Sequence, residues 1–160
     1  MKPKLVLPAS LALIAMAAVS LLAQGLGSKP AKDISFLGWP MTDERLRDGQ
    51  QVYTANCASC HGANLEGQPD WKRRLENGRM PAPPHDETGH TWHHSDRNLF
   101  IITKSGLVAI VPGYESDMPA FKELLTDSEI AAVLAYIKST WPEPQRNYQA
   151  EISANDKGKL

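Results

Sequence analysis

The stretch of sequence that decides this fold is Cys57-Ala58-Ser59-Cys60-His61. It contains the only two cysteines of the 160-residue chain and places a histidine directly after the second. Two thiols three positions apart can each add to one vinyl group of the same porphyrin, and the adjoining imidazole can then bind the iron as its proximal ligand. The pentapeptide therefore predicts one covalently attached haem c, held by Cys57 and Cys60, with His61 on the iron.

Other uses of a Cys-x-x-Cys pair explain this stretch less well. A thioredoxin-like redox couple requires a surrounding βαβ pattern, which the sequence does not show. A zinc site requires two further ligands, and only His85, His90, His93 and His94 could supply them. A simple disulfide would leave His61 without a role. We therefore prefer the haem interpretation.

The composition suits one globular domain with extra length at its ends. Hydrophobic residues make up 42% of the chain and charged residues 22%, as is usual for folded proteins. The formal net charge is −1 at pH 7. Nothing favours nucleic acid as a partner, because nucleic-acid binding requires a clustered basic face.

Residues 1–27 are predicted to be a signal peptide or an N-terminal membrane anchor. Lys2 and Lys4 precede a run of thirteen almost entirely apolar residues, Leu11–Ala23. That length is typical of a signal peptide and short for a membrane span, but the run extends to nineteen residues if it begins at Leu5. Both alternatives predict an exported domain, soluble after cleavage in the first case and anchored in the second.

The rest of the chain divides into three parts. Residues 28–41 are expected to be a linker, because residues 24–40 contain three glycines and two prolines and show weak apolar periodicity. The folded domain is expected over residues 42–141. Residues 142–160 are polar, with two early prolines, and are expected to form a disordered tail.

Three helices are predicted in the domain, each preceded by a polar residue that can cap it. The first two helices cover about residues 43–55 and 96–104. The third begins at a capping box at residues 126–129 and ends by residue 141. Gly49 lies inside the first helix, where glycine costs about 1 kcal/mol relative to alanine. Close approach of the last helix at Gly49 would explain that cost. Prolines in the stretch from residue 71 to residue 92 predict a long loop around the porphyrin.

With this motif and these helices, the chain resembles the class I c-type cytochromes over about residues 43–141. The resemblance implies a small all-α fold in which three main helices and long loops surround one covalently bound haem. It also implies that the first and last helices cross nearly at right angles, with Gly49, Tyr53 and Tyr136 at the contact. Haem is attached to such proteins outside the energy-transducing membrane, which implies a periplasmic location or one on the outer face of the cytoplasmic membrane.

The segment Asp117-Met118-Pro119-Ala120-Phe121 resembles the distal methionine segment of the same family. Met118 is therefore the predicted sixth ligand of the iron. A thioether favours ferrous iron, so His/Met ligation raises the reduction potential. Met80-Pro81 repeats the dipeptide only nineteen residues after His61, but no capped helix follows it. We expect Met80 to pack against the haem edge instead.

The histidines at 85, 90, 93 and 94 allow two interpretations. They could form a second metal site, for example for copper, or supply a replacement axial ligand. Alternatively they belong to a polar loop over the propionate edge, with Trp92 packing inward and one histidine or Arg97 contacting a propionate. We prefer the second interpretation.

The predicted function is transfer of single electrons between unidentified redox protein partners. The protein is then not an enzyme, although it could be a subunit of an oxidoreductase complex. Two alternatives stay open. One is a peroxidase-like enzyme or haem subunit with a labile distal site, in which a histidine acts as distal acid or base. The other is a sensing module in which a gas or copper displaces an axial ligand.

Overall fold

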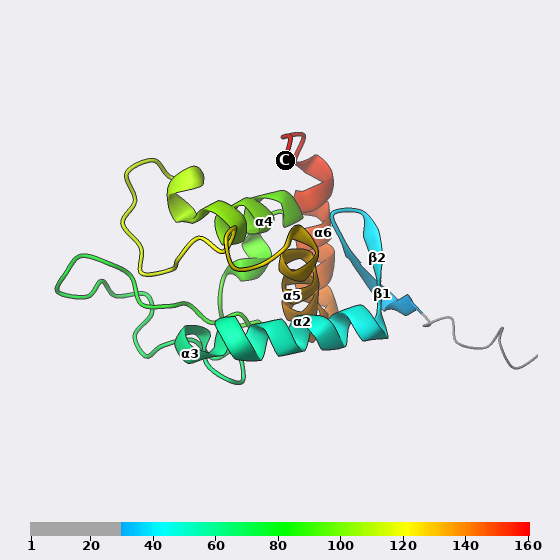
Figure 1. The fold of residues 1–160 in the computed structure, drawn as a ribbon, viewed down its shortest axis with the longest axis horizontal. Coiled ribbons are helices and arrows are strands. Elements are labelled where there is room, and N and C mark those ends of the chain that lie inside the picture. Colours follow the sequence, from blue (N-terminus) through cyan, green and yellow to red (C-terminus); the bar gives the residue numbers. More distant parts are fainter. Residues whose placement is uncertain (1–29) are drawn as a thin grey trace, which may run out of the picture.

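The computed structural model describes residues 30–160. The predicted signal peptide or anchor at residues 1–27 lies outside this range. Figure 1 shows helices packed at the centre, a β-hairpin on one side and two long loops on the other. Within the described range, no helix is both long enough and apolar enough to span a membrane.

The three predicted helices are confirmed. They are α2 (Asp43–Asn56), α4 (Asp96–Ser105) and α5 (Asp127–Thr140). Each begins after the expected cap, because the side chains of Thr42, Ser95 and Thr126 all accept a backbone N–H three residues later. In α5 the Glu129 carboxylate completes the capping box by accepting from the Thr126 backbone N–H at 2.8 Å. The all-α fold class is correct.

Gly49 lies where α2 and α5 cross, as predicted. A Cβ atom at this position would lie 2.1 Å from the carbonyl oxygen of Ala132 on α5. Beside the contact, the rings of Tyr53 and Tyr136 meet with their centroids 5.7 Å apart. Figure 1 shows α5 running across α2 at the centre of the molecule. Glycine is therefore required here by the close approach of the two backbones.

The prediction of a linker over residues 28–41 is wrong for most of that range. Two antiparallel strands, β1 (Pro30–Phe36) and β2 (Trp39–Thr42), form a hairpin with Phe36 paired to Trp39. The two residues between them, Leu37 and Gly38, have φ values of 53° and 82°. Positive φ at both central residues is the signature of the two-residue hairpin turn whose twist matches that of the strands.

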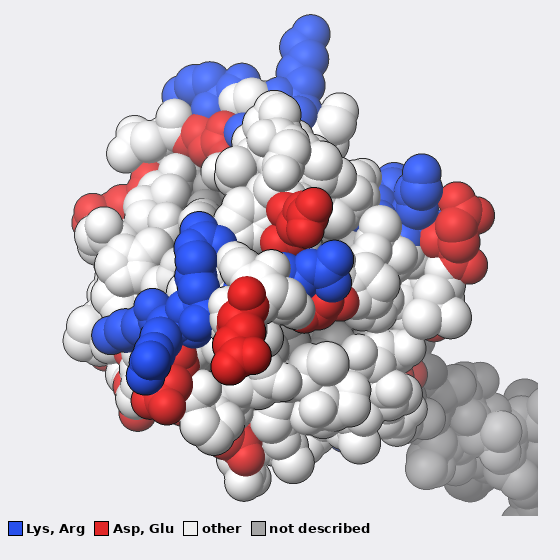
Figure 2. Space-filling model, turned by 90° about the vertical axis from the view of Figure 1, so that its left-hand side faces the viewer, with Lys and Arg blue, Asp and Glu red and all other residues white. Residues whose placement is uncertain are grey.

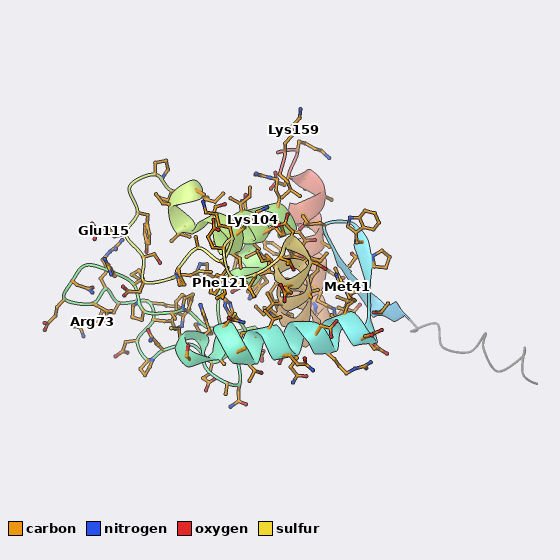
Figure 3. The ribbon with its side chains drawn as sticks, viewed as in Figure 1. Met41, Arg73, Lys104, Glu115, Phe121 and Lys159 are labelled. Carbon is orange, nitrogen blue, oxygen red and sulfur yellow. The ribbon has the colours of Figure 1, made fainter. Side chains whose placement is uncertain are left out.

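The hairpin packs against the helices through three apolar side chains, Ile34, Phe36 and Met41, all buried. Ile34 and Phe36 alternate with the exposed Ser35, so the strand period of two was present in the sequence. The alternation covers only the last three residues of β1, which is too short a run for that period to stand out. The core therefore begins before residue 42, and Figure 3 shows Met41 on the side of α5 where the hairpin lies and Phe121 on the other side.

The prediction of a disordered tail over residues 142–160 is also wrong. Residues Glu143–Asn155 form a helix, α6, which contacts the short 3-10 helix η2 (Thr91–His93). Pro144 lies in its first turn, where proline is tolerated because the backbone N–H has no helical partner. The helix packs through the fully buried amide of Gln149 rather than through an apolar stripe. Hydrophobic periodicity could not reveal it.

The predicted loop is present. Between the one-turn helix α3 (Ala58–His61) and η2, the described chain contains neither α-helix nor strand. A second loop leads from the 3-10 helix η3 (Leu107–Ala109) to α5. Both loops lie on the side of the molecule where α3 is found (Figure 1).

Candidate functional site

The Cys-x-x-Cys-His stretch folds as a single helical turn. Cys57 caps α3, and its carbonyl accepts from the backbone N–H of Cys60 at 3.1 Å and of His61 at 2.9 Å. Residues three and four apart on a helix share one face, so this turn places the side chains of all three residues on the same side. Both cysteines are free, Cys57 partly buried and Cys60 exposed. Burial, reinforced by the neighbouring Cys60, raises the pKa of the Cys57 thiol to about 11.

The ring of His61 is fixed in one tautomer. His61 is 8% exposed, and its Nδ1 lies 2.8 Å from the carbonyl oxygen of Pro83. A carbonyl can only accept a hydrogen bond, so Nδ1 carries the proton and Nε2 has a free lone pair. Burial lowers the pKa of His61, and the Pro83 bond opposes that effect. A neutral imidazole with a free Nε2 is the form that binds a metal.

The carbonyl of Pro83 is itself held in place by the start of the loop. Gly67 has a φ of 71°, and a Cβ atom there would lie 2.4 Å from the nitrogen of Pro84. The backbone N–H of Gly67 donates to the carbonyl of His61 at 2.8 Å, and that of Gln68 donates to the carbonyl of Ala82 at 2.9 Å. These bonds seat the proline-rich segment against α3.

The four histidines of the predicted cluster do not meet at one point. The rings of His90 and His94 contact each other with centroids 5.4 Å apart, whereas His85 and His93 stack on other rings. His85 lies face to face with His61, with ring centroids 3.9 Å apart. His90 stacks on Trp71, and His93 stacks on Trp92. In the part of the chain that the structure describes, no group of three or more His, Cys, Asp or Glu side chains could hold a metal ion. The second-metal interpretation therefore finds no ligand set.

Burial lowers the pKa of three of these histidines. For His85 the lowering is strong, and the nearby His61 and His90 add to the burial effect. His90 and His94 shift in the same direction, also mainly because they are buried. Arg97, a candidate for contact with a propionate, pairs through its Nε with Asp156 at 2.9 Å, and its contact with a propionate stays a prediction.

The segment that bears Met118 is anchored to α4. The backbone N–H of Phe121 donates to the carbonyl of Thr103, and that of Lys122 donates to the carbonyl of Lys104, both at 3.0 Å. Met118 is partly buried and packs, like Cys57, against the hydrophobic core. Iron ligation by Met118 stays a prediction.

An ion pair joins the two loops beside their methionines. The guanidinium of Arg79, the residue before Met80, pairs with Asp117, the residue before Met118, and lies 3.9 Å from Glu115. Figure 3 shows Glu115 on one loop, above the loop that bears Arg73. Figure 2 shows basic and acidic side chains interspersed on this face, without a patch of one sign.

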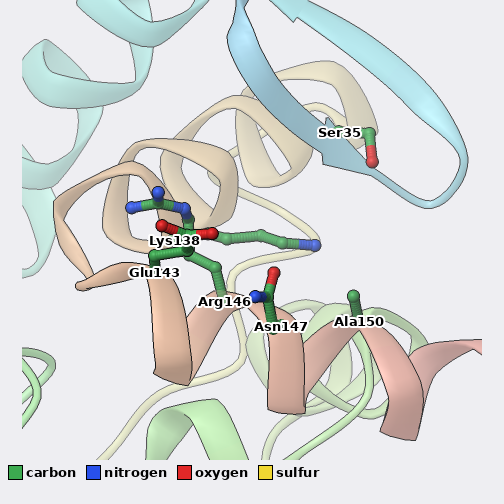
Figure 4. A pocket seen from close by; sticks show the side chains of 6 residues that line it. All are labelled: Ser35, Lys138, Glu143, Arg146, Asn147 and Ala150. Carbon is green, nitrogen blue, oxygen red and sulfur yellow. The ribbon is translucent and has the colours of Figure 1, made fainter.

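A cavity of about 310 Å³ lies elsewhere, between α6 and the hairpin. Figure 4 shows Lys138, Arg146 and the acidic Glu143 at its wall, with Ser35 on the strand above. The Lys138 ammonium is bound to Asp96 at 3.2 Å, and the Arg146 guanidinium donates to the carbonyl of Trp141. The candidate site is thus the α3 face, where two thiols and one free imidazole nitrogen suit covalent attachment and ligation of a haem.

Sequence reasoning missed the contacts that two residues, Pro83 and His85, make with His61; His85 was expected to have other roles. Both contact His61 from more than twenty residues away along the chain. The long proline-rich loop indicated where the porphyrin would be enclosed. No local pattern indicated which carbonyl or ring would meet the imidazole.

The sequence model of the family described as Cytochrome c matches residues 46–141. Among similar proteins, the cbb3-type cytochrome c oxidase subunit CcoP of Rhodobacter capsulatus is 30% identical over 64% of this chain and 31% of its own length. The cytochrome bc1 complex cytochrome c subunit of Mycobacterium tuberculosis is 43% identical over 23% of this chain and 18% of its own length. The chain thus spans less than a third of either relative.

Two smaller proteins are also similar. Cytochrome c-555 of Prosthecochloris aestuarii is 33% identical over 38% of this chain and 68% of its own length. A crystal structure of cytochrome CL from Methylophaga aminisulfidivorans shares 24% identity and covers 74% of this chain and 69% of its own, with a TM-score of 0.47.

Proposed function

The chain belongs to the cytochrome c family, and from this premise we propose that it is an exported electron carrier whose haem iron is bound by His61 and Met118. Membership in the family entails a covalently bound haem c and a role in electron transfer. The bound haem supplies an iron that takes up and releases one electron.

The observation that carries this proposal is the hydrogen bond from His61 Nδ1 to the carbonyl of Pro83. It orients the imidazole and leaves Nε2 free, which is what a proximal ligand requires. Cys57 and Cys60 share the face of α3 with His61 and are the proposed attachment points. Met118 would supply a second protein ligand to the iron, so that the same ligands serve both oxidation states and little reorganises on electron transfer.

We propose that the partners are redox proteins, which this protein contacts either in solution or as a subunit of an oxidoreductase complex. Two of the relatives are named as subunits of an oxidase and of a bc1 complex, which supports this class of partner. Export through residues 1–27 would place the protein in the periplasm or on the outer face of the cytoplasmic membrane. The mass of the polypeptide purified from membrane and soluble fractions tests whether that segment is cleaved.

The ferric absorption spectrum tests the ligand assignment. The native protein should show the iron–sulfur charge-transfer band of His/Met ligation. Met118→Ala should lose the band and lower the reduction potential, because the thioether that favours ferrous iron is gone. Met80→Ala is the matched control, a methionine before a proline in the paired loop, and should keep the band.

Two results would overturn the assignment. Retention of the band in Met118→Ala together with its loss in Met80→Ala would transfer the ligand role to Met80. High-spin ferric haem in the native protein would show an open distal site and favour the enzyme or sensor alternatives.

A further inference from the structure

The ring of His85 lies flat against the ring of His61. Their centroids are 3.9 Å apart and their planes differ by 21°. The ring of Tyr53 meets the ring of His85 in an edge contact, with centroids 6.3 Å apart and an interplanar angle of 71°. His85 thus lies on the face of the His61 ring, the proposed iron ligand. The proposed electron transfer does not by itself explain why His85 is there.

His85 is held at both its side chain and its backbone. Thr91 Oγ1 donates to the carbonyl of Pro84 at 3.4 Å, so it can accept from His85 Nδ1 at 2.8 Å. The backbone N–H of His85 donates to the carbonyl of Leu65 at 2.7 Å. Its carbonyl accepts from the indole N–H of Trp141 at 2.7 Å. The His85 ring is therefore fixed in position before it meets His61.

The two contacts of His61 restrict different motions of its ring. The bond from Nδ1 to Pro83 fixes one point but leaves the ring free to turn about the line of that bond. A flat neighbour at stacking distance removes this rotation, because turning would drive the ring edge into the neighbour. A hydrogen bond from the non-ligating nitrogen helps to orient a ligating histidine, and in this protein the stacked ring of His85 adds a restraint on the plane of the His61 ring.

We propose that His85 is a positioning residue that fixes the plane of the His61 imidazole relative to the haem. The inference rests on the proposed ligation of the iron by His61. His85 does not itself bind the iron in this proposal. It acts only through the ring on which it stacks.

Proton NMR of the ferric holoprotein reads out the imidazole plane directly. In low-spin ferric haem, the plane of the axial histidine sets how unpaired spin is distributed over the porphyrin, and hence the order and spread of the four haem methyl resonances. A merely structural role for His85 would change the free energy of unfolding without changing this pattern. The test compares native protein with His85→Ala, His85→Phe and Thr91→Val.

We expect His85→Ala to change the order or spread of the haem methyl resonances. His85→Phe restores a flat ring and should return the pattern towards the native one. Thr91→Val removes the hydroxyl that holds His85 but keeps the side-chain shape, so a smaller change in the same direction is expected even if His85→Ala fails to fold. His93→Ala is the control, because His93 stacks on Trp92 and not on His61.

Each outcome distinguishes this inference from the proposed function. Absence of hyperfine-shifted His61 ring protons in the native protein would overturn iron ligation by His61, and the inference with it. If those protons are shifted in the native protein but Thr91→Val and His85→Ala keep the native methyl pattern, only the positioning role fails. An equal change in His85→Ala and His85→Phe would also overturn it, since the flat ring would then not be the cause.

Discussion

At the scale of single residues, Gly49 shows how one missing side chain sets the packing of the whole fold. It lies inside α2, where alanine would favour the helix by about 1 kcal/mol. The two nearest atoms that a Cβ would meet belong to the backbone of α5, with the Ala132 oxygen at 2.1 Å and the Ala132 carbonyl carbon at 2.6 Å. Backbone atoms in the middle of a helix cannot move aside as the end of a flexible side chain can, so the contact outweighs helix propensity.

Gly49→Ala should therefore destabilise the holoprotein, by about 1–3 kcal/mol, the usual cost of overpacking a well-packed contact. Urea denaturation of native and variant protein measures the difference in unfolding free energy, and the covalent haem stays on the chain in both states. Gln50→Ala, at the exposed neighbouring position, is the control and should change stability by less than about 0.5 kcal/mol. Equal or greater stability of Gly49→Ala would show that α2 and α5 are not in backbone contact.

The same scale shows what the sequence could and could not predict about the site. Cys57, Cys60 and His61 were identifiable because their chemistry depends on spacing along one helical turn. Pro83 and His85 were not, because their role depends on where a long irregular loop returns to α3. A loop without a period carries no signal of which of its atoms will meet a distant side chain.

At the scale of elements, α6 is held by polar contacts, and its last turn depends on Asp156. That carboxylate accepts from Arg97 Nε at 2.9 Å, from the hydroxyl of Ser95 and from the backbone N–H of Gly158 at 3.0 Å. These bonds lower the pKa of Asp156 to about 2. The bond from Arg97 is the main cause, and those from Ser95 and Gly158 add to it. An aspartate in an unfolded chain has a pKa of about 3.9.

Docking of the end of α6 should weaken on acidification. Because the folded-state pKa is lower than the unfolded one, the contribution of Asp156 is complete above about pH 4 and is lost as pH falls from about 4 towards 2. Hydrogen-exchange protection factors of the α6 amides, corrected for the intrinsic pH dependence of exchange, should fall over this range. Those of α5 are the internal control.

Asp156→Asn provides the decisive comparison for α6. Its helix should already be less protected at neutral pH and should lose the acid-dependent part of the change. An equal acid-dependent loss in native protein and in Asp156→Asn would contradict the role given to this carboxylate.

Elements differed in how well their sequences predicted them. The helices α2, α4 and α5 carry caps and apolar faces, which are local signals, and all three were found. The hairpin and α6 were missed because their structure is stabilised by partners elsewhere in the chain. In α6 the buried side chain is Gln149, whose amide donates to the carbonyl of His94 at 3.2 Å and to Asp96 at 2.7 Å.

At the scale of the whole molecule, one buried carboxylate joins elements that lie far apart in the sequence. Asp96, in the first turn of α4, accepts from the backbone N–H of Leu37 in the hairpin turn at 2.8 Å. It also accepts from the ammonium of Lys138 on α5 at 3.2 Å and from Gln149 on α6 at 2.7 Å. Asp96 and Lys138 are each 6% exposed. Four elements from both ends of the domain thus meet at one ion pair.

Removing one charge of this pair should cost far more than removing an exposed one. Asp96→Ala leaves the Lys138 ammonium buried without its counter-charge, and losses of about 3–5 kcal/mol are usual in that case. The exposed pair between Lys104 and Asp127, at 2.8 Å, is the control, and Lys104→Ala should cost no more than about 1 kcal/mol. Urea denaturation of the holoprotein measures both.

A double-mutant cycle separates the ion pair from the other contacts of Asp96. Lys138→Met alone leaves the carboxylate buried with only its hydrogen bonds to Leu37 and Gln149, whereas Asp96→Ala with Lys138→Met leaves neither charge. The loss of unfolding free energy in the double variant should therefore be smaller than the sum of the losses in the two single variants. The difference should exceed roughly 0.5 kcal/mol, the margin within which independent sites add. Strict additivity would mean that the two charges are not coupled, and that Asp96 joins these elements through its hydrogen bonds to Leu37 and Gln149 and not through the ion pair.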